Sequence, residues 1–140
     1  MKKLFLSAFG LLILTACQTL EPAKLPEWSG AMTKSELAAF LPGKTFTMLD
    51  VGGDYGDGNT VVMNFEGNFN VSGSSTSGAK RNGTWNMREY KGAGLVCMKW
   101  TRKGWGDWCF KLVNDQGSLK FNEISDSTKF QINKVEQVAP

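Results

Sequence analysis

Short runs of alternating apolar and polar residues, from Lys44 onward, constrain the fold more than any other feature of this sequence. Gly, Asn, Asp and Ser separate the runs, and these residue types favour turns. We predict strands near residues 44–50, 59–65, 68–73, 82–88, 94–100, 107–113, 118–124 and 128–134. The links between them are short, which favours antiparallel pairing of consecutive strands. Eight such strands can close into an up-and-down barrel without free edges, and a two-sheet sandwich is the alternative.

Most of these runs have one apolar face, which is expected to line the core. The residues on these faces are Phe46, Met48, Val61, Met63, Phe65, Val71, Trp85, Met87, Leu119, Phe121, Phe130 and Ile132. Between two of the strands, Glu66-Gly67-Asn68 is expected to form a tight turn. The pattern therefore predicts a mainly β domain with a single apolar interior.

One short helix is expected before the strands. Thr33 and Glu36 have the spacing of a capping box, in which each side chain caps the backbone of the other residue. An apolar side follows, formed by Leu37, Phe40 and Leu41, and Pro42-Gly43 then ends the helix. We expect this helix to plug or flank the core rather than to bind a partner.

Cys97 and Cys109 form an even pair once Cys17 is set aside, and a disulfide is the default in an oxidising compartment. A metal pair is the weaker alternative, because the chain has no histidine and no further cysteine to complete a site. If the two cysteines face each other across a hairpin, alternation gives each face of the hairpin one character. The apolar face then holds Val96, Met98, Trp100, Trp108, Phe110 and Leu112, and the charged face holds Lys99, Asp107 and Lys111.

The N-terminus has the features of a secretory signal peptide: two lysines, an apolar run from Leu4 to Leu14, and small residues before a cysteine. The run is too short to span a membrane by itself. Leu14-Thr15-Ala16-Cys17 resembles the lipobox of bacterial lipoproteins. That resemblance implies cleavage before Cys17, a fatty-acylated Cys17 and a lipid anchor in the membrane. Gln18, where aspartate often marks inner-membrane lipoproteins, implies the outer membrane facing the periplasm.

These features divide the chain into residues 1–16 as signal peptide, 17–32 as acylated cysteine and tether, and 33–140 as barrel domain. Pro22, Pro26 and weak periodicity are typical of a tether. Without Lys2 and Lys3 the chain carries 14 basic and 13 acidic residues, so no nucleic-acid partner is expected. The absence of histidine removes the commonest general base, and no spacing of carboxylates suggests catalysis. We therefore expect no enzyme activity and no cofactor.

The hairpin tip, residues 101–106, is the first candidate binding feature. It places Trp105 between two glycines and beside Arg102 and Lys103. Aromatic residues and arginine are typical anchors of protein interfaces, and an exposed tryptophan needs a reason. The alternative, slightly favoured, is that Trp105 folds back as a lid on the barrel end.

The loop at residues 50–59 is the second candidate. Asp50, Asp54, Asp57 and Asn59 offer the hard oxygen ligands that calcium prefers, although the spacing is not that of an EF-hand loop. These residue types are also good turn formers, and we favour a solvated loop with no metal.

Two further features complete the candidates. The Gly- and Ser-rich segment 72–83 is expected to be a flexible loop, in which Lys80 and Arg81 could meet an acidic partner at the barrel mouth. Trp85, Trp100 and Trp108 are expected inside the barrel, where such residues either fill the core or surround one small apolar ligand. Filling is favoured for a domain of this size.

Several motifs, in order, resemble a largely uncharacterised group of small exported proteobacterial domains. They are Leu41-Pro42-Gly43-Lys44-Thr45, Gly83-Thr84-Trp85, Cys97-Met98-Lys99-Trp100 and Trp108-Cys109-Phe110. The resemblance covers most of residues 41–113 and implies a lipocalin-like barrel without a transferable activity. A more distant likeness is to outer-membrane lipoproteins with a small two-cysteine barrel that inhibits proteases.

The expected function is a lipid-anchored, non-catalytic binding module of the envelope, possible partners being a small apolar ligand, a lipid or an envelope protein. One alternative is a protein-interaction or protease-inhibitor module that uses the 101–106 tip. The other is a structural envelope lipoprotein with no ligand.

Overall fold

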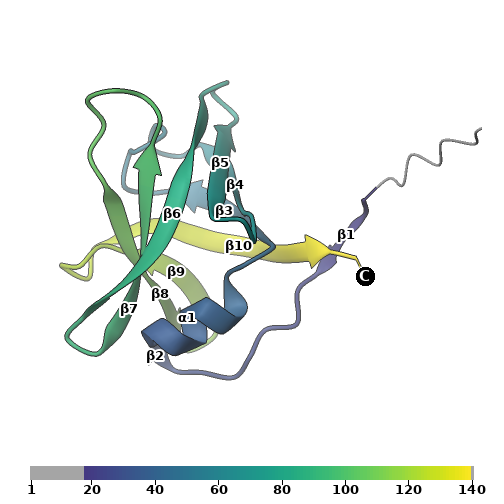
Figure 1. Ribbon diagram of the computed structural model, residues 1–140, viewed down its shortest axis with the longest axis vertical. Helices are drawn as coiled ribbons and strands as arrows, with labels where there is room; N and C mark the ends of the chain where they lie inside the picture. The colour runs from purple at the N-terminus through teal and green to yellow at the C-terminus, as the bar shows by residue number, and fades with distance from the viewer. Residues whose placement is uncertain (1–17, 140) are drawn as a thin grey trace, which may run out of the picture.

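The computed structural model describes residues 18–139, so the predicted signal peptide and the acylated Cys17 lie outside the described residues. One helix, α1 (Lys34–Phe40), and ten strands are present in this range. The strands are β1 (Leu20–Pro22), β2 (Gly30–Ala31), β3 (Lys44–Asp50), β4 (Thr60–Phe65), β5 (Asn70–Ser75), β6 (Lys80–Tyr90), β7 (Ala93–Trp100), β8 (Trp108–Asp115), β9 (Ser118–Asn122) and β10 (Thr128–Val138). Figure 1 shows their arrangement.

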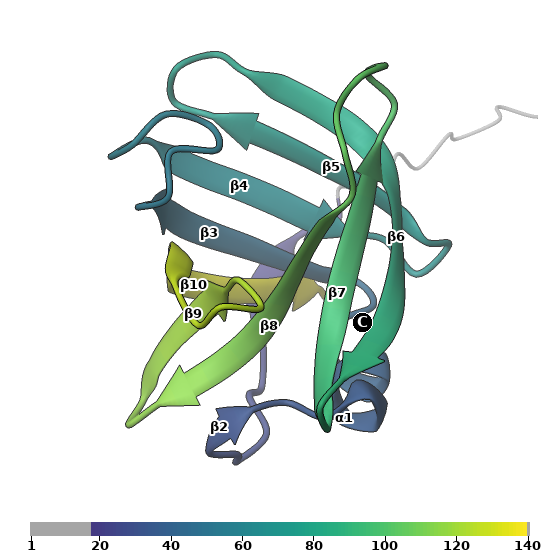
Figure 2. The ribbon, with the colours of Figure 1, turned by 90° about the vertical axis from the view of Figure 1, so that its left-hand side faces the viewer.

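Strands β3 to β10 form a closed eight-stranded antiparallel barrel, as the alternation predicts. Each strand pairs with the next along the chain, and β10 closes the barrel by pairing with β3. Figure 2 shows β3 to β8 wrapping around the barrel in this order. The sandwich is not formed, because β9 pairs with both β8 and β10 and leaves no break between two sheets.

The barrel interior is filled by side chains, and aromatic rings, methionines and leucines supply the largest of them. Rings lie in edge or tilted contact across the whole core, as in Phe46–Phe121 at 5.1 Å, Phe110–Phe130 at 5.7 Å and Phe65–Trp85 at 5.9 Å between ring centroids. Such pairs add about 0.5–1.5 kcal/mol each beyond the burial of apolar area. The predicted inward faces are therefore confirmed, and the interior is packed rather than hollow.

The disulfide hairpin has the predicted register. Cys97 lies opposite Cys109, to which it is disulfide-bonded, Met98 lies opposite Trp108, and Val96 opposite Phe110. One charged residue of the outer face differs from expectation. Lys111 is only 8% exposed, because the β9–β10 turn covers it: its Nζ donates to the backbone oxygen of Ile124 and pairs with the Asp126 carboxylate.

Helix α1 closes one end of the barrel. The predicted capping box is present, with the Thr33 side chain accepting from the Glu36 backbone and the Glu36 carboxylate accepting from the Thr33 backbone. The helix lies so close to β7 that a Cβ atom on Gly94 would be 2.7 Å from the Lys34 nitrogen. Within residues 18–139, no helix reaches the length and apolarity that crossing a membrane requires.

The segment predicted as a tether lies along the barrel instead. β1 pairs with the end of β10, with Leu20 opposite Val138, and β2 pairs with β8. Between them, the Trp28 ring packs on Phe40 of the helix. The prediction is wrong because β10 runs to Val138, four residues beyond the expected end, and offers the segment a free edge to pair with. The N-terminal segment therefore belongs to the folded domain.

Different links and elements lie at the two ends of the barrel. The links 51–59, 76–79, 101–107 and 123–127 lie at one end, which we call the mouth. The terminal end, opposite, holds α1, the 66–69 turn and both ends of the described chain, where the Ala139 N–H donates to the Thr19 oxygen. In Figure 1 the terminal end lies to the right and below, away from the β7–β8 link at the upper left.

Candidate functional site

Three of the predicted binding residues meet at the mouth. Trp100 ends β7, Trp108 begins β8, and their rings lie 5.4 Å apart in an edge contact. Trp105, from the link between these strands, folds back and stacks on Trp108 at 6.3 Å with an angle of 12° between the rings. Trp105 is therefore a half-buried lid on the barrel end rather than a projecting anchor.

The other three predicted binding residues are placed differently. The Arg102 guanidinium lies 4.9 Å from the Trp105 ring, and Lys103 is exposed at the tip of the link. Trp85 lies apart from this group, where its indole N–H donates to the Glu66 oxygen near the terminal end. Trp85 is therefore part of the core, and its hydrogen bond leaves it no free polar group.

Asp50 builds the loop that covers the mouth. Its side chain is fully buried at the end of β3, and its two carboxylate oxygens accept from the backbone N–H groups of Gly52, Gly53 and Tyr55. Asn59 closes the loop from the other side by donating to the oxygens of Tyr55 and Gly56.

These contacts use the side-chain oxygens of two of the four residues that the calcium hypothesis requires, Asp50 and Asn59. Asp50 satisfies backbone donors, and the Asn59 side-chain oxygen accepts from the Thr76 hydroxyl. Within residues 18–139, no three Asp, Glu, Cys or His side chains are grouped as a metal site.

Tyr55 reaches from this loop across the mouth. Its ring is in edge contact with Trp108 at 6.1 Å and with Phe130 at 6.4 Å, and the residue is only 5% exposed. The hydroxyl lies over Gly73 of β5, where a Cβ atom would be 2.1 Å from the hydroxyl oxygen. Gly73 is therefore the position that gives the phenol its space.

Arg81 lies opposite Gly73 on β6 and occupies the centre of the group. Its guanidinium carbon is 3.9 Å from the Tyr55 ring centroid, 4.1 Å from that of Trp105 and 4.4 Å from that of Trp108. The Nη2 group donates to the backbone oxygen of Asp54. We call Arg81 with Tyr55, Trp100, Trp105 and Trp108 the mouth cluster.

The mouth cluster contains several donors without an acceptor. The Nε and Nη1 groups of Arg81, the Tyr55 hydroxyl and the Trp100 indole nitrogen are all buried, and none makes a hydrogen bond of good geometry in the described chain. Arg81 and the Tyr55 hydroxyl are nevertheless close enough for each to act on the pKa of the other through a side-chain contact. Among the described residues, Arg81 also forms no ion pair. Buried polar groups are nearly always paired in proteins, so four such atoms in one cluster mark a site.

Burial also shifts the pKa values of Tyr55 and Arg81 in this cluster. It raises the pKa of Tyr55 to about 12, so the phenol is a neutral donor at physiological pH. It lowers the pKa of Arg81 from its usual value, against the opposing effect of nearby Tyr55, Asp54 and Asp50. The cation is thus held where solvent screens it poorly.

A small charged rim lies beside the cluster. Lys129 Nζ is 3.2 Å from a carboxylate oxygen of Glu123 and 4.0 Å from one of Asp54. The hydrogen bond that Lys129 donates to the Glu123 carboxylate raises the pKa of Lys129. Burial raises the pKa of Asp54, and Lys129 partly offsets this effect. The rim carboxylates are therefore already associated with Lys129 rather than with Arg81.

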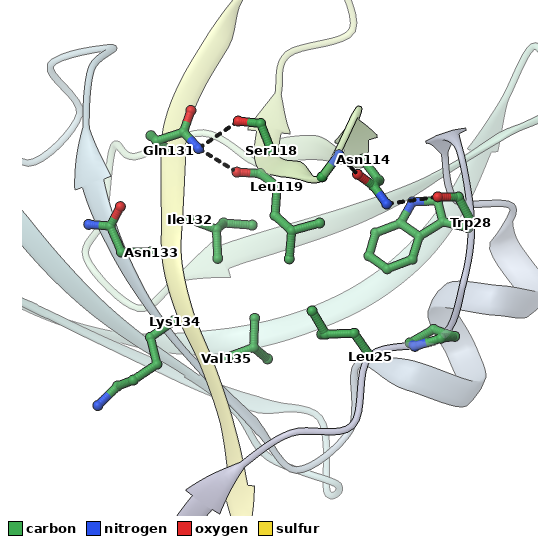
Figure 3. A pocket seen from close by; sticks show the side chains of 12 residues that line it. Leu25, Trp28, Asn114, Ser118, Leu119, Gln131, Ile132, Asn133, Lys134 and Val135 are labelled. Carbon is green, nitrogen blue, oxygen red and sulfur yellow. Dashed lines mark hydrogen bonds between the residues drawn. The ribbon is translucent and has the colours of Figure 1, made fainter.

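A hollow lies on the barrel wall, between the N-terminal segment and strands β9 and β10 (Figure 3). It forms because β10 leaves β9 after Gln131 and bends at a bulge before Lys134. The groove has a volume of about 520 Å³ and an apolar floor that includes Leu119 and Ile132. Gln131 donates to the Ser118 hydroxyl and the Leu119 oxygen, as the dashed lines show. This groove lacks the unpaired polar groups that distinguish the mouth.

Sequence reasoning left Tyr55 and Gly73 unassigned and gave Arg81 only a general place in a flexible loop. Segment 72–83, predicted as that loop, instead forms most of the β5–β6 hairpin, with Ser74 opposite Lys80. Trp85, Gly83 and Arg81 are two residues apart along β6. The inward position of Trp85 would therefore have predicted that Arg81 also faces inward. No family model, curated protein or solved structure matches this chain, so the assignment of the site rests on its geometry.

Proposed function

We propose that this chain is a lipid-anchored, non-catalytic binding module of the bacterial envelope, which holds a small, mainly apolar ligand at its mouth. The mouth cluster carries the proposal: aromatic rings from three segments surround Arg81, and four buried polar atoms have no partner. Ligand sites typically combine apolar walls with a few unpaired polar groups in this way.

The position of the chain ends supports an orientation for such a module. Cys17 immediately precedes the described residues, and Thr19 is hydrogen-bonded to Ala139 at the terminal end. An acyl group on Cys17 would therefore hold the terminal end at the membrane and turn the mouth away from it. At the outer membrane, which Gln18 favours by resemblance, the mouth would face the periplasm.

The Cys97–Cys109 disulfide supports export, because structural disulfides persist in oxidising compartments and are rare in the bacterial cytosol. The chain has no histidine, and the rim carboxylates Asp54 and Glu123 are associated with Lys129, which supports binding rather than catalysis. The packed aromatic core supports a site at the barrel end, above the interior, rather than a deep central cavity.

A structural envelope role without a ligand is the second candidate. It is favoured by the packed interior and by the folded-back Trp105, which leaves no exposed aromatic side chain at the hairpin tip. The binding function and the structural role differ in what they require at the mouth. A structural role does not require buried hydrogen-bond donors without acceptors there.

The anchor is tested by cell fractionation of a Cys17→Ser variant, with Thr19→Ser as a control that leaves the lipobox intact. We expect Cys17→Ser to leave the membrane fraction and the control to remain there. Membrane association of Cys17→Ser with an unmodified N-terminus would refute the lipid anchor.

The ligand is tested by native mass spectrometry of residues 18–140, exported to the periplasm and purified gently. We expect an additional mass that is lost on denaturation. Trp105→Ala should lose this mass, whereas Tyr90→Ala, which removes an exposed aromatic residue far from the mouth, should keep it. A protein that carries no additional mass would favour the structural role.

A further inference from the structure

The unpaired groups of the mouth cluster share one property, which is that they donate hydrogen bonds. Arg81 offers two N–H donors, Trp100 offers its indole N–H, and Tyr55 offers a hydroxyl that stays protonated because its pKa is about 12. Tyr55 and Trp100 are 5% and 4% exposed, so bulk water does not reach them freely. A molecule that binds to these groups would therefore have to supply a hydrogen-bond acceptor.

These donors are close together. Arg81 lies diagonally across from Trp100 on the inward face, because Gly83, two residues along β6, is the direct partner of Trp100. Tyr55 and Arg81 are near enough that each shifts the pKa of the other. A Cβ atom on Gly83 would meet the Lys99 backbone at 2.2 Å, so the strands leave no room for a side chain between Arg81 and Trp100. Glycine at this position therefore lets the β7 backbone lie against β6 next to the two donors.

The charge of Arg81 further limits which chemical class of acceptor fits the mouth cluster. The ring faces of Tyr55, Trp105 and Trp108 attract the guanidinium, but they do not supply lone pairs for its N–H groups. The acceptor that Arg81 does have is the neutral backbone oxygen of Asp54. The rim carboxylates of Asp54 and Glu123 approach Lys129 instead. Asp54 and Asp50 lie near enough to favour the charged form of Arg81, but among the described residues neither forms an ion pair with it. A partly buried cation with no direct ion pair favours an anionic acceptor over a neutral one.

We propose that the mouth cluster binds the carboxylate of a small aromatic or otherwise apolar acid, with Arg81 and Tyr55 as the carboxylate ligands and Trp105 as the lid. The planar fork of arginine matches the two oxygens of a carboxylate. The packed interior below excludes a long chain running down the barrel axis, so the apolar part lies against Trp105 and Trp108. This inference rests on the proposed function, since it names the ligand of the same site.

The lid is built to move without unfolding the barrel. Residues 102–107 have no strand pairing, and Trp105 is held by a turn hydrogen bond to the Arg102 oxygen and by its ring contacts. Gly104 has a φ of 89°, and Gly106 has open space around its Cβ position. Rotation about these two glycines would lift the ring from Arg81 and let the acid enter.

The test is a titration of residues 18–140 with benzoate, followed by NMR of the Trp100 indole N–H and the Arg81 Nε–H. Benzamide, which has the same ring and no charge, is the matched probe. We expect benzoate to shift both signals with one saturation curve and benzamide to leave them unchanged. Unchanged signals at high benzoate concentration, or equal shifts with benzamide, would overturn the proposal.

Variants identify the ligands of the carboxylate. Arg81→Gln should raise the dissociation constant by at least about tenfold, and Tyr55→Phe by about ten- to a hundredfold, the effect of one hydrogen bond to a charged group. Tyr55→Phe keeps the ring and its packing, so it remains informative if Arg81→Gln fails to fold. The control is Lys120→Gln on the β8–β9 hairpin, whose partner is Asp115 and which is outside the lid, and it should bind benzoate normally. Normal binding by Tyr55→Phe and Arg81→Gln would overturn the assignment.

The proposed binding function and the proposed carboxylate ligand can be refuted by different results. The titration uses soluble protein, so it does not depend on acylation of Cys17. A natural ligand found by mass spectrometry to be uncharged would overturn the carboxylate proposal and leave the binding function intact. A bound water molecule that fills the cluster and is not displaced by benzoate would also overturn it, because the donors would then have a permanent partner.

Discussion

Replacing Gly73 by alanine tests whether the Tyr55 phenol occupies the mouth as the structure places it. Gly73 has no left-handed φ, so the backbone of β5 accepts alanine without strain. The new Cβ atom, however, would be 2.1 Å from the Tyr55 hydroxyl oxygen and 3.1 Å from Cζ. The first distance requires the phenol to move, whereas the second needs only a few tenths of an ångström.

The expected change in the free energy of unfolding of Gly73→Ala follows from two opposing effects. Replacing glycine by alanine stabilises a compatible site by about 0.4–1 kcal/mol, through the entropy of the unfolded chain. Overpacking in a packed region costs about 1–3 kcal/mol. We therefore expect Gly73→Ala to lower the free energy of unfolding by about 1–2 kcal/mol. In a Tyr55→Phe background, which removes the oxygen, the same change should be close to neutral, giving a coupling energy of about 1–2 kcal/mol.

The assay is urea unfolding of the parent, the two single variants and the double variant, followed by tryptophan fluorescence. Gly67→Ala is the matched control, because Gly67 also lacks a left-handed φ and has no atom within 4 Å of its Cβ position. This control should be neutral or slightly stabilising. Additive effects of Gly73→Ala and Tyr55→Phe, within about 0.5 kcal/mol, would refute the contact between them.

Three further predictions concern stability. Reduction of the Cys97–Cys109 disulfide, which joins residues 12 apart, should cost about 3 kcal/mol and lower Tm by roughly 10 °C in a thermal scan; an unchanged Tm would contradict this contribution. Asp50→Asn should lower the free energy of unfolding by about 1–3 kcal/mol, because an amide nitrogen cannot accept from the loop N–H groups that both carboxylate oxygens now serve; urea unfolding equal to that of the parent would contradict this role. Hydrogen bonds from the Thr33 backbone and side chain hold the pKa of Glu36 below its usual value of 4.5, so the stability this carboxylate contributes is present above pH 4.5 and is lost as pH falls through the lowered pKa. Glu36→Gln should therefore flatten the dependence of Tm on pH in that acidic window, and an unchanged pH profile would contradict the capping box.

The barrel could be predicted from the sequence because local and long-range signals agree in it. Alternation fixes which residues face inward, and the Cys97–Cys109 pair fixes the register of one hairpin independently. The capping residues Thr33 and Glu36 likewise define the start of the helix from four positions alone. Each of these features depends on residues that are close in sequence or that share a strict period.

The mouth cluster could be predicted only in part, because its key contacts depend on a loop and on barrel closure. Tyr55 is placed by hydrogen bonds from loop N–H groups to Asp50, and no sequence period describes such a loop. Arg81 faces inward because β6 begins at Lys80, yet the Gly and Ser content around it favours a loop. The strand forms there because closure of the barrel supplies a neighbour on each side.

The hydrogen bond between Ala139 and Thr19 brings the two ends of the described chain together at the terminal end. A short linker could join them, and new ends could be opened in the 76–79 link at the mouth, which would preserve every pairing of the eight-stranded barrel. A lipid-bearing cysteine placed at the new N-terminus of this circular permutant would then invert the barrel on the bilayer. Under the proposed anchor on Cys17, the orientation of the mouth relative to the membrane would therefore depend on where the chain is cut, and it could be changed independently of the fold.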